Sequence, residues 1–204
     1  MFLVIEGVDG TGKSTQVGRV ANGLRERGRE VVETFEPGAT AAGAAMRDVL
    51  LDASIDLTPL AEALLLAADR AHHLSVVVRP ALERGADVVT DRYVPSSLAY
   101  QGIARELGVP TVEELNRIAT GGLAADLVVV LDVPPDVATT RRGGSDRLEA
   151  LDDGFHDKVR RAYLDLAAEN GWAVLDGSAP PDDVTKRILA EVDAMLEGEQ
   201  ERSR

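Results

Sequence analysis

Near the start of the chain, eight residues have the types and spacing that bind the phosphates of a nucleotide. The segment GVDGTGKS, Gly7 to Ser14, fits the pattern G-x-x-x-x-G-K-[ST] without a gap. Glycines let the backbone close around a polyphosphate so that its N–H groups point inward. Lys13 would reach the β- and γ-phosphates, and the Ser14 hydroxyl would hold Mg²⁺. We expect the loop to bind the phosphates of a nucleotide through Gly7, Val8, Asp9, Gly10, Thr11, Gly12, Lys13, Ser14 and Thr15.

Arginines lie in several separate segments, where they could neutralise the charge of a second anion near this loop. Two phosphates repel each other and approach in line only when cations and N–H dipoles neutralise the charge between them. Arg92, with Asp91 before it, follows the apolar pair Val88 and Val89 where a strand should end. The other candidates are Arg47, Arg70, Arg141, Arg142 and Arg147.

The elements that must hold these residues alternate between strands and helices. Near-continuously apolar strands separated by amphipathic helices predict an α/β fold with a five-stranded parallel sheet covered by helices on both faces. The expected strands are Phe2–Ile5, Glu30–Phe35, Asp87–Thr90, Ala125–Val133 and Trp172–Leu175. The expected helical segments are Thr15–Arg27, Ala41–Leu51, Thr58–Arg79, Pro80–Arg84, Thr111–Thr120 with a capping box, Pro134–Arg142, Gly154–Asn170 and Pro181–Leu196. The segment Pro95–Gly102 is expected to be either helical or irregular.

The composition limits the possible partners. With 204 residues, of which 45% are hydrophobic, residues 1–204 suit one domain with a sizeable core. The absence of cysteine excludes thiolate metal sites, and no apolar run is long enough for a signal peptide or a membrane span, so we expect a cytoplasmic protein without a membrane partner. The formal net charge of −13 argues against a nucleic acid partner.

Six segments resemble, in order, the signature blocks of the bacterial-type thymidylate kinase family. They are FLVIEGVDGTGKST, TFEPGATAAGAAMR, LLLAADRAHHL, DRYVPSSLAYQG, DRLE and FHDKVRRAYLDLA, which together span almost the whole chain. The resemblance implies a P-loop kinase fold that transfers the γ-phosphoryl group of ATP to dTMP, giving dTDP and ADP, with Mg²⁺ and as a homodimer.

The resemblance also implies roles for individual residues. Arg92 would bind the acceptor phosphate and act with Lys13 in catalysis, while Asp91 and Ser14 would support Mg²⁺. Asp9 would accept the 3′-hydroxyl of the deoxyribose, and Tyr100 would lie against the sugar. The other expected substrate contacts are Glu36, Arg47, Leu66, Arg70, Ser97 and Gln101.

The chain departs from the family pattern at positions that bear on substrate binding. Phe35 replaces the usual arginine before the Glu-Pro-Gly turn, and Leu66 replaces a phenylalanine that would stack on the base. Losing that aromatic face removes about 1 kcal/mol of stacking, so we expect either looser base selectivity or compensation by Phe35. Ala39 and Ala44 stand where a glycine and a glutamate are usual.

Gly10 stands where some family members carry an arginine in the loop. Relatives without that arginine supply one from a mobile lid, here a short segment at about residues 141–149 broken by Gly143 and Gly144. We expect Arg141, Arg142 or Arg147 to close over ATP, and we favour Arg142 and Arg147 as the catalytic candidates.

Two other functions stay open from the sequence. Leu66 and Phe35 allow another nucleoside or deoxynucleoside monophosphate kinase with relaxed base choice. A regulatory protein that binds ATP through its P-loop is the second alternative, although such a protein needs no arginines spaced for a second anion.

Overall fold

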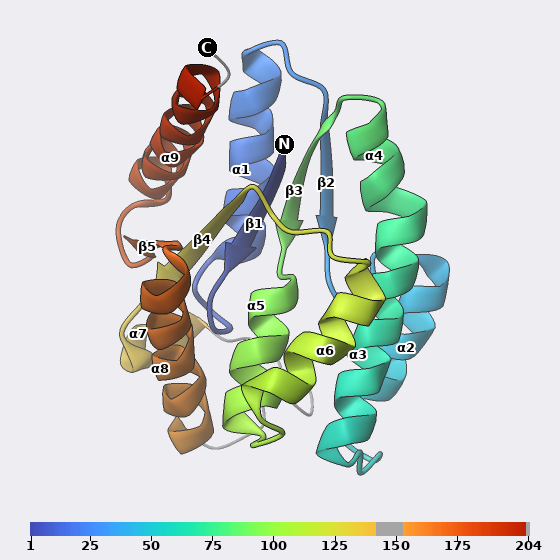
Figure 1. The fold of residues 1–204 in the computed structure, drawn as a ribbon. Helices are drawn as coiled ribbons and strands as arrows, with labels where there is room; N and C mark the ends of the chain where they lie inside the picture. Colours follow the sequence, from blue (N-terminus) through green and yellow to red (C-terminus); the bar gives the residue numbers. More distant parts are fainter. Residues whose placement is uncertain (142–152, 203–204) are drawn as a thin grey trace.

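The structure is a computed structural model that describes residues 1–141 and 153–202. Its centre is a five-stranded sheet in which every pair of neighbouring strands is parallel, in the order β2-β3-β1-β4-β5 (Figure 1). The strands are β1 (Phe2–Glu6), β2 (Val31–Phe35), β3 (Asp87–Asp91), β4 (Leu127–Asp132) and β5 (Ala173–Asp176). The predicted sheet and its five strands are therefore confirmed, with differences of one or two residues at the strand ends.

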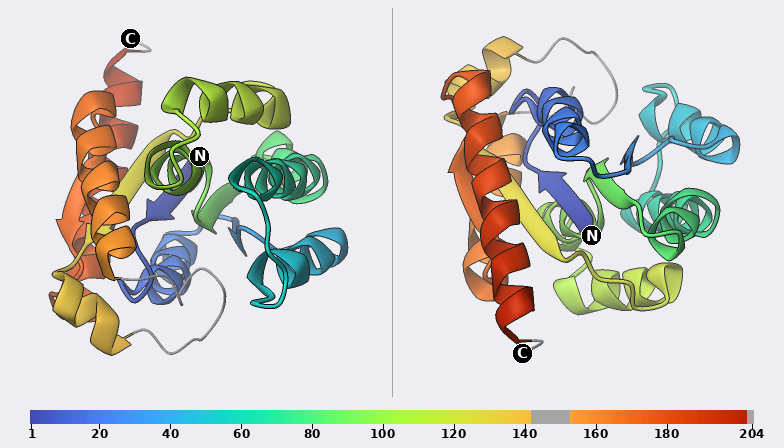
Figure 2. Two further views of the ribbon diagram at one scale, coloured as in Figure 1. Left: turned by 90° about the horizontal axis from the view of Figure 1, so that it is seen from below. Right: turned by 90° about the horizontal axis from the view of Figure 1, so that it is seen from above.

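Helices cover both faces of the sheet, as predicted. Figure 2 shows α1 (Lys13–Glu26) on one side and α6 (Val109–Thr120) on the other. The remaining helices are α2 (Ala41–Leu51), α3 (Pro59–His73), α4 (Arg79–Glu83), α5 (Val94–Ser97), α7 (Pro135–Arg141), α8 (Asp153–Asn170) and α9 (Pro181–Arg202). Two π-helical segments are inserted between them, η1 (Leu74–Val78) and η2 (Leu98–Ala104).

The apolar run of β1 divides its side chains between two cores. Leu3 and Ile5 pack with α1 and α9 on one face, whereas Phe2 and Val4 pack with η1, α4 and β3 on the other. Successive side chains of a strand point to opposite faces, so a strand buried on both sides reads as a continuous apolar run. All five residues of β1 are buried, and β1 is the middle strand of the sheet, so the loop after Glu6 lies at the centre of the sheet edge.

Two expectations about helices need correction. The long pattern from Thr58 to Arg79 is not one α-helix, because it contains η1 before α4 begins at Arg79. The predicted capping box at Thr111 is wrong: α6 begins two residues earlier, after Gly108 at φ +84°, with no side-chain cap. Pro110 in the first turn, whose fixed φ suits a helix start, moves that boundary upstream.

The carboxyl ends of the strands meet at one edge, where the predicted functional segments gather. The loop after β1, the Glu-Pro-Gly turn after β2 and the Asp-Arg-Tyr segment after β3 all leave the sheet there (Figure 1). This is the edge at which open α/β sheets bind ligands. Among the described residues, no helix combines the length and apolar character needed to cross a membrane.

Candidate active site

Two adjoining cavities lie at this edge. The inner cavity is lined by Asp9, Glu36, Pro37, Arg47, Leu50, Leu51, Leu66, Asp69, Arg70, Arg92, Ser96, Ser97, Tyr100 and Gln101. The loop cleft is lined by Asp9, Gly10, Gly12, Lys13, Ser14, Thr15, Val17, Glu33, Thr34, Phe35, Glu36, Arg47, Asp91, Arg92 and Arg141. The structure thus brings together in the inner cavity every residue predicted to contact the acceptor.

The loop between β1 and α1 has the geometry of a phosphate cradle. Thr11 Oγ1 and Lys13 Nζ each donate to the carbonyl oxygen of Val8 at 2.9 Å, which closes the loop on itself. Gly7 has φ +139°, and a Cβ there would lie 2.5 Å from the Leu131 carbonyl oxygen. Of the nine predicted loop residues, Gly7, Val8 and Thr11 shape the loop, and the other six line the loop cleft.

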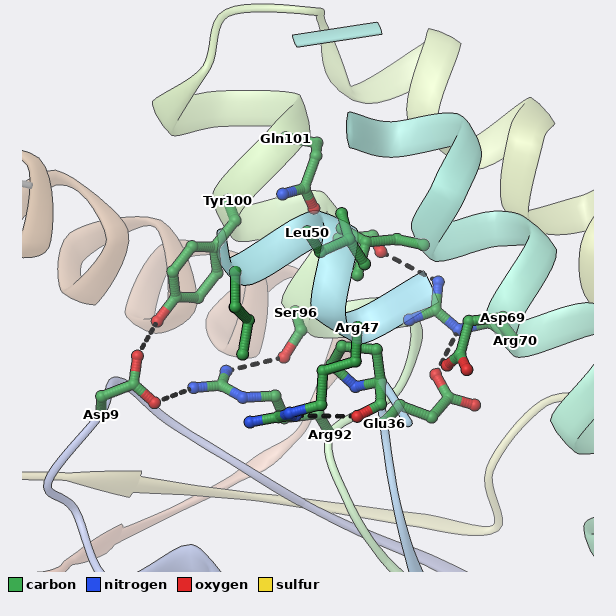
Figure 3. A pocket seen from close by; sticks show the side chains of 14 residues that line it. Asp9, Glu36, Arg47, Leu50, Asp69, Arg70, Arg92, Ser96, Tyr100 and Gln101 are labelled. Atoms are coloured by element: carbon green, nitrogen blue, oxygen red, sulfur yellow. Dashed lines mark hydrogen bonds and ion pairs between the residues drawn. The ribbon is translucent and has the colours of Figure 1, made fainter. Parts of the chain in front are cut away.

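Asp9 joins the two cavities through an ionic network. Arg92 Nη2 donates to Asp9 Oδ1 at 2.5 Å, and Tyr100 Oη donates to Asp9 Oδ2 at 3.3 Å (Figure 3). Lys13 Nζ lies 3.7 Å from Asp9 Oδ1. Burial raises the pKa of Asp9, but the neighbouring Arg92 and Lys13 outweigh burial and hold this pKa well below its usual value. Burial, reinforced by the charge of Arg92, lowers the pKa of Lys13.

Arg92 is held from its other side by a buried carboxylate that the sequence analysis did not single out. Arg92 Nη1 donates to Ser96 Oγ at 3.0 Å and to Tyr163 Oη at 3.2 Å. Ser96 and Tyr163 in turn donate to Glu6 Oε2 at 2.7 and 2.8 Å. Glu6 is fully buried, and burial raises its pKa. An acidic residue ending an apolar strand is the sequence signal that could have found it.

Arg70 is fixed at four points in the wall of the inner cavity (Figure 3). It donates from Nε to Glu36 Oε2 at 2.7 Å, from Nη1 to Ser97 Oγ at 2.9 Å, from Nη2 to the Tyr93 carbonyl at 3.0 Å, and from Nη1 also to Asn116 Oδ1. Asn116, on α6, was missed because nothing in its local sequence marks it. The arginine therefore presents a fixed guanidinium to whatever enters the cavity.

Glu36 lines both cavities, but its carboxylate is engaged inside the protein. Besides Arg70, it contacts His73 Nδ1 at 2.9 Å, and His73 Nε2 lies 2.6 Å from Thr34 Oγ1. The histidine is buried, and it supports Glu36 from behind without lining either cavity.

Arg47 lies where the two cavities meet and follows the turn after β2. Its Nη1 donates to the Pro37 carbonyl at 2.8 Å, and a Cβ on Gly38 would lie 2.8 Å from its Cδ. Asp69 Oδ1 accepts from the Gly38 N–H at 3.2 Å. Burial, with the nearby Glu36 carboxylate, raises the pKa of Asp69. The glycine therefore allows the turn, the arginine and the aspartate to pack closely.

Ser14 and Asp91 form the part of the loop cleft that could hold a metal ion. Ser14 Oγ donates to Asp91 Oδ2 at 2.5 Å, while Asp91 Oδ1 is buried without a hydrogen-bond partner among the described residues. A hydroxyl and a carboxylate are the oxygen ligands that Mg²⁺ prefers, and such an ion usually takes its remaining ligands from water and phosphate. Within the described part of the chain, no group of three or more His, Cys, Asp or Glu side chains could hold a metal by itself.

The departures from the family pattern have different consequences. Leu66 lines the inner cavity, whereas Phe35 lines the loop cleft with 44% of its surface exposed. Phe35 is therefore not placed to take over the face of a base in the inner cavity. Gly10 has φ +87°, and a Cβ there would lie 2.4 Å from the Ala138 carbonyl of α7, so the loop leaves no room for a side chain at this position.

Of the three arginines expected in the lid, only Arg141 belongs to the described residues. It lines the loop cleft and donates from Nη1 to the Gly177 carbonyl at 3.1 Å. Arg142 and Arg147 lie outside the described residues.

Comparison with known proteins gives one consistent result. A family model described as thymidylate kinase matches residues 5–188. The chain is 48% identical over 201 residues to the thymidylate kinase of Leifsonia xyli subsp. xyli, covering 96% of each chain. It is 45% identical over 197 residues to that of Deinococcus radiodurans, covering 94% of this chain and 96% of the relative. The thymidylate kinase of Thermosynechococcus vestitus is 42% identical over 204 residues, covering 92% of this chain and 85% of the relative.

The ionic network around Asp9 gives a testable prediction. Replacing Arg92 with leucine removes one of the two cations that lower the pKa of Asp9 but leaves burial in place, so this pKa should rise. An NMR titration of the Asp9 carboxyl carbon between about pH 2 and 7 measures the change. The pKa of Asp9 in the folded protein lies below its value in the unfolded chain, which is near 3.8. The stability that ionised Asp9 contributes is therefore fully present above about pH 3.8. It is lost as the pH falls toward the folded pKa.

The matched control is Arg19→Leu, which removes an exposed arginine paired with Asp182 on the surface. It should leave the titration of Asp9 unchanged. A wild-type pKa at or above the ordinary value, or one that Arg92→Leu does not move, would contradict the electrostatic account of this site.

Proposed function

Because the chain belongs to the thymidylate kinase family, we propose that the loop cleft binds ATP and the inner cavity binds dTMP. The chain transfers the γ-phosphoryl group of ATP to dTMP, giving dTDP and ADP. The bond between the γ-phosphorus and the β,γ-bridging oxygen breaks as a phosphate oxygen of dTMP bonds to that phosphorus. The observation that carries the assignment is the shared wall: Asp9, Glu36, Arg47 and Arg92 line both cavities.

The wall of the inner cavity offers distinct partners to each part of dTMP. Arg70, Ser97 and Gln101 supply the hydrogen-bonding groups expected at the thymine edge. Asp9 and Tyr100 lie together at the other end of the cavity, where they suit the deoxyribose and its 3′-hydroxyl. Polar groups of this kind reject an ill-matched base, because an unpaired buried partner is costly.

Charge stabilisation and positioning account for the catalysis. The acceptor is already an anion, so the reaction needs no general base, and cations at the junction of the two cavities reduce the repulsion between the phosphates. Arg92 and Arg47 are at that junction, and Lys13 reaches it from the loop. Asp9 holds Arg92 and Lys13 close to each other before any nucleotide binds.

We propose Mg²⁺ as the accompanying metal ion, held by Ser14 and by Asp91. The buried, unpartnered Asp91 Oδ1 beside the Ser14 hydroxyl supports this assignment. When bound with ATP, the ion would neutralise phosphate charge. The chain's own residues supply its protein ligands and keep the carboxylate in place.

A purely regulatory ATP-binding role fits the site less well. A switch protein passes phosphate to water and needs no second nucleotide site, whereas here a cavity with a fixed arginine adjoins the loop cleft. A kinase with relaxed base choice remains the closer alternative, because Leu66 offers no aromatic face.

We further propose a single catalytic domain that acts as a homodimer in the cytoplasm. Leu60 and Leu64 on α3 and Ile118 on α6 are 47%, 49% and 66% exposed, and these two helices pack side by side, which supports an apolar contact face. Ile103 on η2 packs against the protein's own core and is not part of this face. Sedimentation velocity tests the dimer, and a monomer at micromolar concentration would overturn it.

The acceptor specificity tests the function directly. With Mg·ATP, dTMP should be phosphorylated with a higher kcat/KM than dUMP, dCMP, dGMP or AMP, because the inner cavity is built around fixed donors and acceptors. A coupled assay across this panel measures the order, with Lys13→Met as the inactive control. Equal or higher kcat/KM with a purine nucleotide would favour the relaxed kinase.

Restoring an aromatic face should tighten base binding. Leu66→Phe adds a ring in the cavity wall, and stacking worth up to about 1 kcal/mol corresponds to a fall of roughly 5-fold in the KM for dTMP. Steady-state kinetics measure it. Val76→Phe, at a half-exposed position on η1 away from both cavities, should change nothing. An unchanged or higher KM in Leu66→Phe would show that this wall does not face the base.

We propose that the segment at about residues 141–149 supplies the catalytic arginine that the loop lacks. Arg142→Ala or Arg147→Ala should lower turnover at saturating nucleotide by at least ~10-fold, because such an arginine stabilises the transferring phosphoryl group. Arg117→Ala, on the exposed face of α6, is the control. If the Arg142→Ala and Arg147→Ala enzymes each keep a turnover within ~10-fold of the wild-type value, the proposal is refuted.

A further inference from the structure

A second buried carboxylate stands behind the inner cavity, and the motifs do not account for it. Glu62 on α3 is fully buried and does not line the cavity. Its Oε1 accepts a hydrogen bond from Gln101 Nε2 at 2.8 Å, and its Oε2 pairs with Arg105 Nη2 at 3.2 Å. Gln101 itself lines the cavity and is 2% exposed. One carboxylate oxygen is thus bound to a cavity residue and the other to an arginine behind it.

This contact decides which end of the Gln101 amide faces the cavity. An ionised carboxylate only accepts hydrogen bonds, so the group that points to Glu62 must be the NH₂ of the amide. The amide oxygen then points away from Glu62, and Figure 3 shows the Gln101 side chain reaching toward the cavity with its oxygen on the side of Leu50. Without a pure acceptor behind it, the amide could turn over with almost no change of shape.

The orientation matters because pyrimidine bases differ at their ring nitrogen. In thymine and uracil the N3 atom carries a hydrogen and donates, whereas in cytosine N3 is an acceptor. A fixed carbonyl oxygen in the cavity wall accepts a hydrogen bond from the N3–H group of thymine or uracil. With cytosine the same oxygen would face the N3 acceptor, and neither atom would have a hydrogen bond. Arg70, anchored at four points, has one remaining Nη2 N–H for a base carbonyl nearby.

We propose that Glu62 is a positioning residue that locks Gln101 as a hydrogen-bond acceptor and thereby selects a base with a ring N–H over cytosine. Arg105 keeps the second oxygen of Glu62 engaged, and its guanidinium lies 5.2 Å from the centre of the Phe155 ring. The carboxylate is consequently fixed in direction as well as in place. This inference rests on the proposed binding of dTMP in the inner cavity.

The test is the isosteric change Glu62→Gln, with kcat/KM measured for dTMP, dUMP and dCMP. The new amide has a single acceptor oxygen to share between Gln101 and Arg105, so Gln101 can turn over. The preference for dTMP over dCMP should fall by at least ~10-fold, mainly through a higher KM for dTMP, since one base-directed hydrogen bond is lost. The ratio of dTMP to dUMP should not change, because these two bases share the N3–H group.

Controls separate this role from a general loss of structure. Ile188→Ala opens the core between α1 and α9, far from Glu62, and should lower the thermal midpoint while leaving the dTMP to dCMP ratio intact. Gln101→Met should lower the ratio as much as Glu62→Gln, and the double variant should lower it no further, since both changes remove the same acceptor. Glu62→Met, similar in length, provides the second test if Glu62→Gln folds poorly.

The outcomes are distinct. A folded Glu62→Gln enzyme with the wild-type dTMP to dCMP ratio overturns the inference while leaving the proposed function intact. A ratio that falls equally in Ile188→Ala also overturns it. Failure of the wild-type enzyme to prefer dTMP would instead overturn the proposed function, and this is visible before any variant is measured.

Discussion

The site depends on holding buried cations in place before an anionic substrate arrives. Arg70 has 2% of its side chain exposed and Arg92 has 15%. A guanidinium removed from water needs partners that compensate for its lost hydration, and an unpaired one would be strongly destabilising. Each arginine therefore has its own carboxylate, Glu36 for Arg70 and Asp9 for Arg92. The charges that receive the phosphates are oriented by the fold itself.

These pairs need further support, and that support comes from residues behind the cavities. Glu6 accepts hydrogen bonds from Ser96 and Tyr163, and these two hydroxyl groups in turn accept hydrogen bonds from Arg92. In the same way His73 contacts Glu36, whose carboxylate pairs with Arg70. Such preorganisation is what electrostatic catalysis requires, because dipoles that are already aligned need not reorganise during the reaction. It also explains why these polar side chains are tolerated in the interior, since each residue of the two chains of contacts has a hydrogen-bond partner.

Close backbone approach is the second constraint on the site. Gly7 lies against the Leu131 carbonyl and Gly10 against the Ala138 carbonyl, so the phosphate loop is enclosed by β4 and α7. Glycine is required at both places because of the positive φ angle and the short contact. The packing of α7 over Gly10 gives a structural reason for the missing loop arginine, which is consistent with a catalytic arginine from another segment.

The sequence by itself determined the class of fold, the phosphate loop and most of the cavity wall. These features are encoded locally: apolar runs of strand length, glycines at fixed spacing, and polar residues placed directly after strands. The start of α6 was misjudged, because a capping box and an upstream proline compete within a few residues.

Only the tertiary structure decided which partners hold the site residues. Four supporting residues contact partners between 37 and 157 positions away in the chain, namely Glu6, Glu62, His73 and Asn116, and no local pattern records such pairs. It also placed Phe35 in the loop cleft instead of the inner cavity. Long-range contacts of this kind arise from the parallel sheet, whose strand order brings distant segments to one edge, so their chemistry is set by packing and not by spacing along the chain.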